Sequence, residues 1–260
     1  MRGLYDKVVV VCAGGTGDGT ALGASIGGVT ARRLAAEGAK VVVGDLDEAA
    51  AHRTAALVVD EGGVAVGQHY EASDEESARR LMERAEAEFG GIDGVHFNAI
   101  DTSSDVDGEH DLTSVPLDVW HRRLDVGLLG FVLAARFAIP QLVNRGGGGV
   151  VCTTSDAAYL GEPVRVAYAA AKAGMGAVVR HIASRFGAEG VRANAVSPGF
   201  VPSAVMLEDP RFQKNQRHPR SDRLGRPDDI AAMVTFLLSD DGAWVNGQSI
   251  CVDGGIVMRP

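Results

Sequence analysis

Residues 8–28 read VVVVCAGGTGDGTALGASIGG, and this stretch decides the fold. The apolar run at 8–12 predicts a buried strand, and the glycines after it permit a sharp turn into a helix around residues 29–37. Glycine also lets the backbone approach a pyrophosphate, whose charge the N–H groups of a helix N-terminus can bind. Because a strict GxGxxG spacing is absent, a plain turn remains the alternative to a phosphate-binding loop.

Short apolar runs alternate with helical patterns along the rest of the chain. Further strands are predicted at 41–44, 64–70, 92–98, 150–154, 191–197 and 249–252, and helices near 48–61 and 74–89. Continuous apolar strands that alternate with helices predict a parallel sheet covered on both faces. We therefore expect one doubly wound α/β domain over residues 1–260, with a predominantly parallel seven-stranded sheet. The longest irregular region, about 200–226, is expected to be a surface loop or a lid over the substrate.

Composition narrows the class of partner and compartment. The formal net charge of −9, from 25 basic and 34 acidic residues, disfavours nucleic acid or an anionic membrane as a partner. Cys12, Cys152 and Cys251 each lie in an apolar run, so we expect reduced, buried thiols with no disulfide or metal role. The N-terminus shows no signal-peptide pattern and no long apolar span is apparent, which predicts a cytoplasmic protein.

Asp45 directly follows the second predicted strand. A carboxylate at this place can accept hydrogen bonds from the adenosine ribose hydroxyls of a dinucleotide. It would repel a 2′-phosphate, so the sequence favours NAD over NADP. The alternative is that Asp45 caps the helix that starts near Glu48, and the two roles are compatible.

Tyr168 and Lys172 are four residues apart in a helix-forming stretch, which places them on one helix face. A neighbouring ammonium favours the phenolate, so Tyr168 could take a proton from an alcohol while hydride leaves its carbon. Ser155, at the end of the strand predicted at 150–154, could hold the substrate oxygen as it gains charge. The alternative is a surface lysine whose stem covers a half-buried tyrosine.

Together these features resemble the short-chain dehydrogenase/reductase family, over residues 7–255. Beyond Ser155, Tyr168 and Lys172, the similar segments are ARRLAAEGAKVVVGD (31–45), RANAVSPG (192–199), RLGRPDDIA (223–231) and GQSICVDGG (247–255). The resemblance implies a Rossmann-type fold, an NAD cofactor, a small-molecule alcohol or ketone substrate, and a homotetramer or other homo-oligomer. It also implies that Ser155 orients the substrate, that Tyr168 is the acid/base, and that Lys172 binds the nicotinamide ribose and tunes Tyr168.

The resemblance further implies a set of cofactor contacts. These are Gly14, Ser25, Ile26, Gly27, Asp45, Glu71, Asn98, Ala99, Tyr168, Lys172, Pro198, Gly199, Val201 and Ser203.

Three departures from the family pattern stand out. The phosphate loop gains about eight residues, with Ala13 at its first glycine position and Ser25 at its middle one. Phe97 and Ile100 replace an Asn and a Gly of the family's Asn-Asn-Ala-Gly, and would add bulk near the adenine side of the cofactor. Gly127 replaces an Asn whose side chain helps hold a water that links the lysine to solvent. We therefore expect proton transfer to be weakened rather than abolished.

The sequence thus predicts an NAD(H)-dependent oxidoreductase that interconverts a secondary alcohol and a ketone. The alternative is a catalytically weakened nucleotide-binding or scaffold protein of the same fold. Enoyl reduction is disfavoured, because related enoyl reductases place the lysine seven residues after the tyrosine, where this chain has Met175. Candidate residues of the substrate pocket are Tyr159, Phe200, Met206 and Leu207, with ordinary loop or core packing as the alternative.

Overall fold

The computed structural model describes residues 1–16, 25–101, 111–202 and 219–258, and a parallel sheet of seven strands forms its centre. The order across the sheet is β3-β2-β1-β4-β5-β6-β7, and every pair is parallel. The strands are β1 (Val8–Cys12), β2 (Lys40–Asp45), β3 (Val64–His69), β4 (Gly94–Phe97), β5 (Gly148–Thr153), β6 (Val191–Pro198) and β7 (Ser249–Val252). The order reverses between β1 and β4, so a crevice for a ligand is expected at the carboxyl ends of these two strands.

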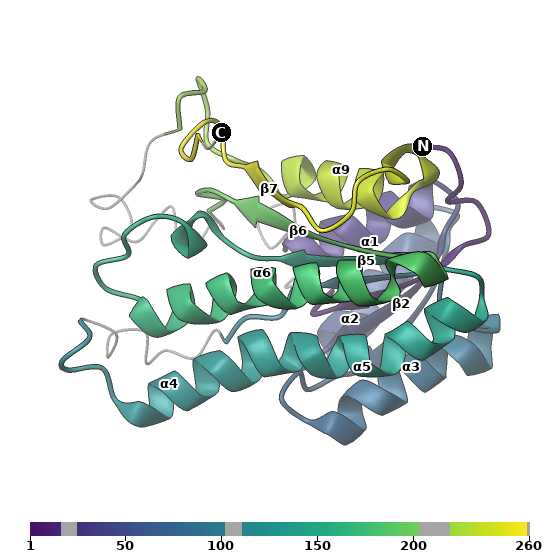
Figure 1. Cartoon of the computed structure of the whole chain (residues 1–260). Coiled ribbons are helices and arrows are strands. Elements are labelled where there is room, and N and C mark those ends of the chain that lie inside the picture. Colours follow the sequence, from purple (N-terminus) through teal and green to yellow (C-terminus); the bar gives the residue numbers. More distant parts are fainter. Residues whose placement is uncertain (17–24, 102–110, 203–218, 259–260) are drawn as a thin grey trace.

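Helices cover both faces of the sheet (Figure 1). One face carries α1 (Ile26–Ala36), α2 (Glu48–Asp60) and α9 (Pro227–Leu238), and the other carries α3 (Glu75–Phe89), α5 (Gly130–Asn144) and α6 (Val166–Phe186). The central strands are largely buried on both sides, which is why they read as continuous apolar runs in the sequence. The edge strands β3 and β7 are partly exposed. The predicted doubly wound α/β fold with seven strands is confirmed.

The predicted bounds differ from the structure by a few residues. The first helix begins at Ile26 rather than near 29, because the Ser25 side chain accepts a hydrogen bond from the Gly28 N–H and caps the helix. Of the irregular region predicted at 200–226, residues 200–202 and 219–226 have no helix or strand, and residues 203–218 lie outside the described part.

A run of helix from Leu117 to Asn144 joins α4 (Leu117–Arg123), the π-helical turn η3 (Leu124–Leu129) and α5. It is long and apolar enough to cross a membrane, with a mean hydropathy of 1.8, whereas the sequence led us to expect no such span. Half of that window is buried inside the protein, and α5 packs against α3. A core helix passes the same test of length and composition, so this run is weak evidence for a membrane segment.

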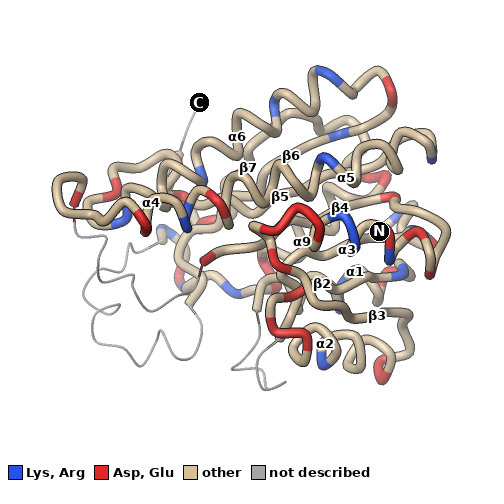
Figure 2. The backbone as a smooth tube through the Cα atoms, turned by 90° about the horizontal axis from the view of Figure 1, so that it is seen from below, with Lys and Arg blue, Asp and Glu red and all other residues tan. Residues whose placement is uncertain are grey.

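Charged residues are spread over the described surface. Figure 2 shows Lys and Arg interspersed with Asp and Glu along the helices, in keeping with the many ion pairs between neighbouring turns. Exposed pairs of this kind add little stability, and their main effect is on solubility.

Candidate active site

The N-terminus of α1 lies directly against the end of β1. A Cβ atom added to Gly27 would lie 2.1 Å from the carbonyl oxygen of Ala13, so only glycine allows this approach. The hydroxyl of Ser25 donates to the Gly15 carbonyl at 2.7 Å and fixes the loop to the helix. The positive end of the helix dipole therefore points to the crevice at the switch between β1 and β4.

Ala13 occupies the position at which the family pattern has its first glycine, and its backbone conformation is unusual for an alanine. Its φ of 62° lies in the left-handed region that favours glycine. The turn thus keeps a glycine-like conformation with an alanine in it, which costs on the order of 1–2 kcal/mol.

Asp45, the last residue of β2, lies beside this loop. Its Oδ2 accepts the Gly15 N–H at 2.8 Å, and its Oδ1 accepts the Asp47 N–H at 3.1 Å. The alternative role as a helix cap is wrong for Asp45: the N-cap of α2 is Asp47, whose side chain accepts from the Ala49 N–H. Asp45 therefore lies at the end of β2, and both of its carboxylate oxygens accept backbone N–H groups.

Ser155 follows β5 and starts a short 3₁₀ turn, η4 (Asp156–Ala158). Its Oγ accepts the Ala157 N–H at 3.2 Å and donates to Asp156 Oδ1 at 3.1 Å. Lys172, on α6, is buried and donates from Nζ to the Thr153 carbonyl at 2.8 Å. Both residues thus meet at the carboxyl end of β5, as the spacing predicts.

Tyr168 lies one turn before Lys172 on α6. The Lys172 Nζ lies 5.8 Å from the centre of the Tyr168 ring, and the Arg165 guanidinium lies 5.1 Å from it. The tyrosine is partly exposed and the lysine is 3% exposed, so the alternative of a surface lysine over the ring is wrong.

The electrostatics differ from the sequence expectation. Burial raises the pKa of the Tyr168 phenol, although a hydrogen bond with Ser155 and the charges of Arg165 and Arg123 lower it in part. We expected the neighbouring ammonium to lower this pKa. Burial dominates instead, and it also lowers the pKa of Lys172 to about 8, which weakens the lysine's charge at alkaline pH.

Gly127 lies in the π-helical turn η3, which packs against α6. Such π-turns often occur at functional sites. A Cβ atom at this position would lie 3.4 Å from the Ala171 Cβ, an ordinary contact. Packing against Ala171 therefore does not require a glycine at position 127. The contact of the Cβ atom gives no steric reason for the absence of the asparagine that the family pattern has here.

The other predicted cofactor residues also follow strand ends. Asn98 and Ala99 follow β4; the Asn98 N–H donates to the Cys12 carbonyl at 3.0 Å and its side-chain Nδ2 donates to the Ala13 carbonyl at 3.4 Å. Glu71 follows β3, and Pro198 ends β6 with Gly199 and Val201 after it. The structure thus brings them to the carboxyl edge of the sheet. Ser203, Met206 and Leu207 lie outside the described residues, whereas Tyr159 and Phe200 are half-buried after β5 and β6.

Two sequence expectations need correction. Phe97 adds no bulk to the cofactor crevice: it is fully buried and its ring lies 5.6 Å from that of Phe131 in the core. It shares a strand face with Val95, and this face packs against α5, so period-two alternation carries its ring away from the crevice. Ile100 is 45% exposed.

The expectation of three buried thiols also needs correction. Cys12 and Cys152 are buried, whereas Cys251 is only partly buried.

Sequence reasoning missed three charged residues near Tyr168. Asp156 and Arg123 are buried, and Arg165 is half-buried. Arg123 forms an ion pair with Asp101 over 3.7 Å. The sequence did carry a signal for two of them, because Asp156 is next to Ser155 and Arg165 is one helical turn before Tyr168.

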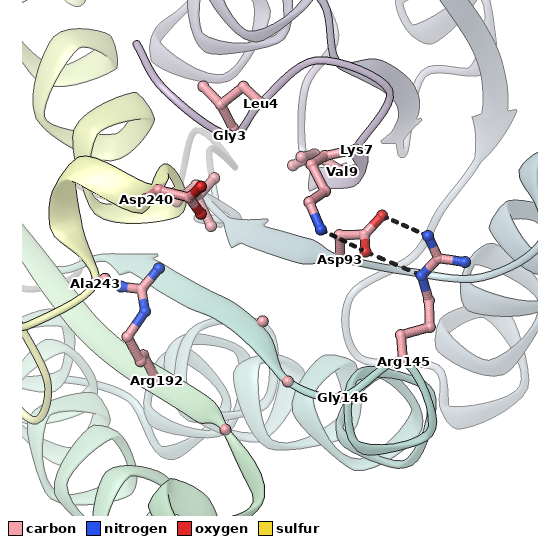
Figure 3. A pocket seen from close by; sticks show the side chains of 14 residues that line it. Gly3, Leu4, Lys7, Val9, Asp93, Arg145, Gly146, Arg192, Asp240 and Ala243 are labelled. Carbon is pink, nitrogen blue, oxygen red and sulfur yellow. Dashed lines mark hydrogen bonds and ion pairs between the residues drawn. The ribbon is translucent and has the colours of Figure 1, made fainter.

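A cavity of about 230 Å³ lies at the opposite, amino end of the sheet (Figure 3). Charged groups that line the cavity pair with one another. Arg145 donates to both Asp93 carboxylate oxygens, at 3.0 and 3.1 Å, and the Lys7 Nζ lies 3.5 Å from Asp93 Oδ1. Arg192 donates to the Leu237 carbonyl at the end of α9. Ligands of open α/β sheets bind at the carboxyl ends of the strands, so this cavity is not the active site.

Comparison with known proteins agrees with this arrangement. A family model described as enoyl-(acyl carrier protein) reductase matches residues 19–257. A "Probable short-chain type dehydrogenase/reductase" of Bradyrhizobium diazoefficiens is 36% identical over 92% of this chain and 85% of its own length. The cis-4-hydroxycyclohexanecarboxylate dehydrogenase of Sinomonas cyclohexanicum is 34% identical over 91% and 94% of the two chains.

A solved structure shows the same fold. It is a 7α-hydroxysteroid dehydrogenase in complex with NADH and 7-oxo glycochenodeoxycholic acid, with a TM-score of 0.86 and 29% identity over 99% of this chain and 96% of that one. With the sheet order, the residues at its carboxyl edge and these relatives in agreement, the chain belongs to the short-chain dehydrogenase/reductase family.

Proposed function

We propose that the protein is an NAD(H)-dependent oxidoreductase that interconverts a secondary alcohol and a ketone. The observation that carries the proposal is the meeting of Ser155, Tyr168 and Lys172 beside the end of β5. Two relatives support it by name, since one is a dehydrogenase of a ring alcohol and the other was solved with NADH and an oxo-steroid.

The residues present fit a dinucleotide. The N-terminus of α1 would hold the pyrophosphate, Asp45 the adenosine ribose, and Lys172 the nicotinamide ribose. The nicotinamide supplies the hydride chemistry when it is bound. Asp45 carries a charge that repels a 2′-phosphate, so NAD is the proposed cofactor rather than NADP.

The proton is handled by the protein's own groups. In alcohol oxidation the Tyr168 phenolate takes the hydroxyl proton as hydride leaves the carbon, and in ketone reduction the phenol returns it. The positive charges of Lys172 and Arg165 at the ring favour the phenolate against the cost of its burial. Ser155 holds the reacting oxygen next to Tyr168.

Gly127 favours a second candidate, a nucleotide-binding protein with weakened catalysis. It offers a carbonyl but no side-chain amide to a water on the path between Lys172 and solvent. This candidate differs from the first in turnover and not in cofactor binding. We further propose a cytoplasmic homo-oligomer, which size-exclusion chromatography with light scattering and cell fractionation would test.

The test starts with fluorescence titrations of NADH and NADPH. We expect tighter binding of NADH, and Asp45→Ala should narrow the difference whereas Asp60→Asn, an exposed acid at the end of α2, should not. Turnover is then measured on a panel of alcohols and ketones that includes cis-4-hydroxycyclohexanecarboxylate, with Tyr168→Phe as the inactive control. Binding without turnover on a broad panel would favour the second candidate, and binding of neither nucleotide would overturn both.

A further inference from the structure

Arg165 lies at the start of α6, where the loop after β5 enters the helix. It precedes Tyr168 by three residues and Lys172 follows Tyr168 by four, so the two cations flank the phenol along the helix axis. The Arg165 guanidinium lies 5.1 Å from the centre of the Tyr168 ring, and the Lys172 Nζ lies 5.8 Å from it. Because Lys172 would hold the nicotinamide ribose, Arg165 lies on the side of the phenol that is left for the substrate.

The Arg165 guanidinium uses few of its hydrogen-bond donors within the described part of the chain. Its ion pair there joins Nη2 to Glu162 Oε2 at 2.9 Å. A guanidinium carries five N–H donors in a rigid planar fork, so most of them remain for a ligand. The Glu162 side chain is 5% exposed and the Arg165 side chain is 40% exposed. The buried acid therefore anchors an arginine that solvent still reaches.

The other two cations of the described site are buried. Lys172 is 3% exposed and donates to the Thr153 carbonyl, and Arg123 is 6% exposed and pairs with Asp101. Arg165 is thus the cation of this group that an incoming molecule can contact. The chain as a whole is acidic, with a net charge of −9, so an anionic substrate would need a local positive group of this kind.

A planar guanidinium with unused donors matches a carboxylate, which it can bind through two parallel hydrogen bonds. We propose that Arg165 is a specificity residue that binds a carboxylate on the substrate. Because Arg165 lies one turn of α6 away from Tyr168, this carboxylate is several bonds from the reacting carbon. The substrate class is then a hydroxy acid, or the corresponding oxo acid, with its two functional groups far apart. This inference rests on the proposed function.

Matched substrates separate carboxylate binding from the effect of Arg165 on Tyr168. Each pair is a hydroxy acid and its carboxamide, which has nearly the same shape without the charge, starting with cis-4-hydroxycyclohexanecarboxylate. The ratio of kcat/KM for the acid to kcat/KM for the amide is compared in wild type, Arg165→Gln and Arg180→Gln. A change in proton transfer at Tyr168 affects both members of a pair and cancels in the ratio. Arg180, exposed about four turns further along α6, controls for the loss of a cation elsewhere.

We expect the wild type to prefer the acid by about ten-fold or more, since a hydrogen bond to a charged group corresponds to a change of roughly that size. The ratio should fall close to one in Arg165→Gln and stay high in Arg180→Gln. Circular dichroism checks folding. If Arg165→Gln does not fold, Arg165→Lys, which keeps the charge and loses the planar fork, should lower the ratio as well. A wild-type ratio near one in every pair, or a ratio that survives the loss of Arg165, overturns the inference and leaves the proposed function standing.

A binding measurement decides the case in which the wild type turns over no member of the panel, so that the proposed function fails. The probe is cyclohexanecarboxylate, with cyclohexanecarboxamide as the neutral control, in calorimetric titrations with and without NADH. Binding of the acid that is about ten-fold weaker in Arg165→Gln than in wild type and Arg180→Gln would support a carboxylate site at Arg165. Equal binding in all three proteins, or no binding of the acid, overturns it.

Discussion

Acid should destabilise this protein in part through one side chain, His96 on β4. The imidazole is fully buried, and its Nε2 lies 2.9 Å from the Thr153 hydroxyl. Its Nδ1 has no hydrogen-bond partner in the described part of the chain. Burial, together with the charge of Lys172, lowers the pKa of His96 from 6.5 to about 3. The folded protein therefore keeps this histidine neutral at pH values where the unfolded chain protonates it.

The sign and size of the effect follow by linkage. Above pH 6.5 His96 is neutral in both states and contributes no pH dependence. As the pH falls from 6.5 toward 3, only the unfolded state takes up the proton, so the free energy of unfolding decreases. Each pH unit is worth about 1.4 kcal/mol, which gives a loss of about 2 kcal/mol at pH 5. His96→Gln cannot titrate and should lack this loss.

Urea denaturation at pH 7.5 and pH 5.0 measures the effect. The quantity compared is the decrease in free energy of unfolding between the two pH values, because the substitution also changes packing at both. We expect the decrease to be about 2 kcal/mol smaller in His96→Gln than in the wild type. His52→Gln, on the exposed face of α2, controls for the loss of a histidine as such. Equal decreases in wild type and His96→Gln would refute the reasoning.

Two further substitutions test the departures from the family pattern. Gly127→Asn should fold, because its Cβ makes an ordinary 3.4 Å contact with Ala171, and should raise turnover and change its pH profile by restoring a side-chain amide. The same turnover and profile as wild type, in steady-state assays, would contradict this. Ala13→Gly should raise the free energy of unfolding in urea by up to about 1 kcal/mol, since it relieves a left-handed backbone with φ of 62°. A lower stability would show that the alanine is not strained there.

The strands and the shared helix face of Tyr168 and Lys172 could be predicted because each depends on local order along the chain. Buried parallel strands are apolar runs, and a spacing of four residues on a helix fixes the shared face of Tyr168 and Lys172. The role of Asp45 as a cap could not be decided in this way, since Asp45 and Asp47 are both plausible caps and only the backbone at the start of α2 separates them.

The burial of individual side chains could not be predicted from the sequence. The charged neighbours of Tyr168 predict a lower pKa, but the loss of solvation around the phenol outweighs them and raises the pKa. Asp156 and Arg123 were missed for the same reason, because in sequence they read as ordinary charged residues and only the fold buries them beside the tyrosine. Phe97 shows the converse: alternation along β4 already placed it on the same face as Val95, away from the crevice.

Arg123 and Gly127 belong to one continuous helical segment. The first bears on the stability of the Tyr168 phenolate, and the second on the exchange of its proton with solvent. Arg123 ends α4, and its charge lowers the pKa of both Tyr168 and Lys172. A guanidinium stabilises the phenolate but cannot pass on a proton, because it stays protonated at any pH the enzyme meets. Gly127, four residues later, has no side-chain amide where the family pattern implies one that holds a relay water. Under the proposed function, the charge that favours the phenolate is kept while the proton relay implied by the family pattern lacks its side-chain amide. We therefore expect resupply of the proton to limit turnover more than hydride transfer does.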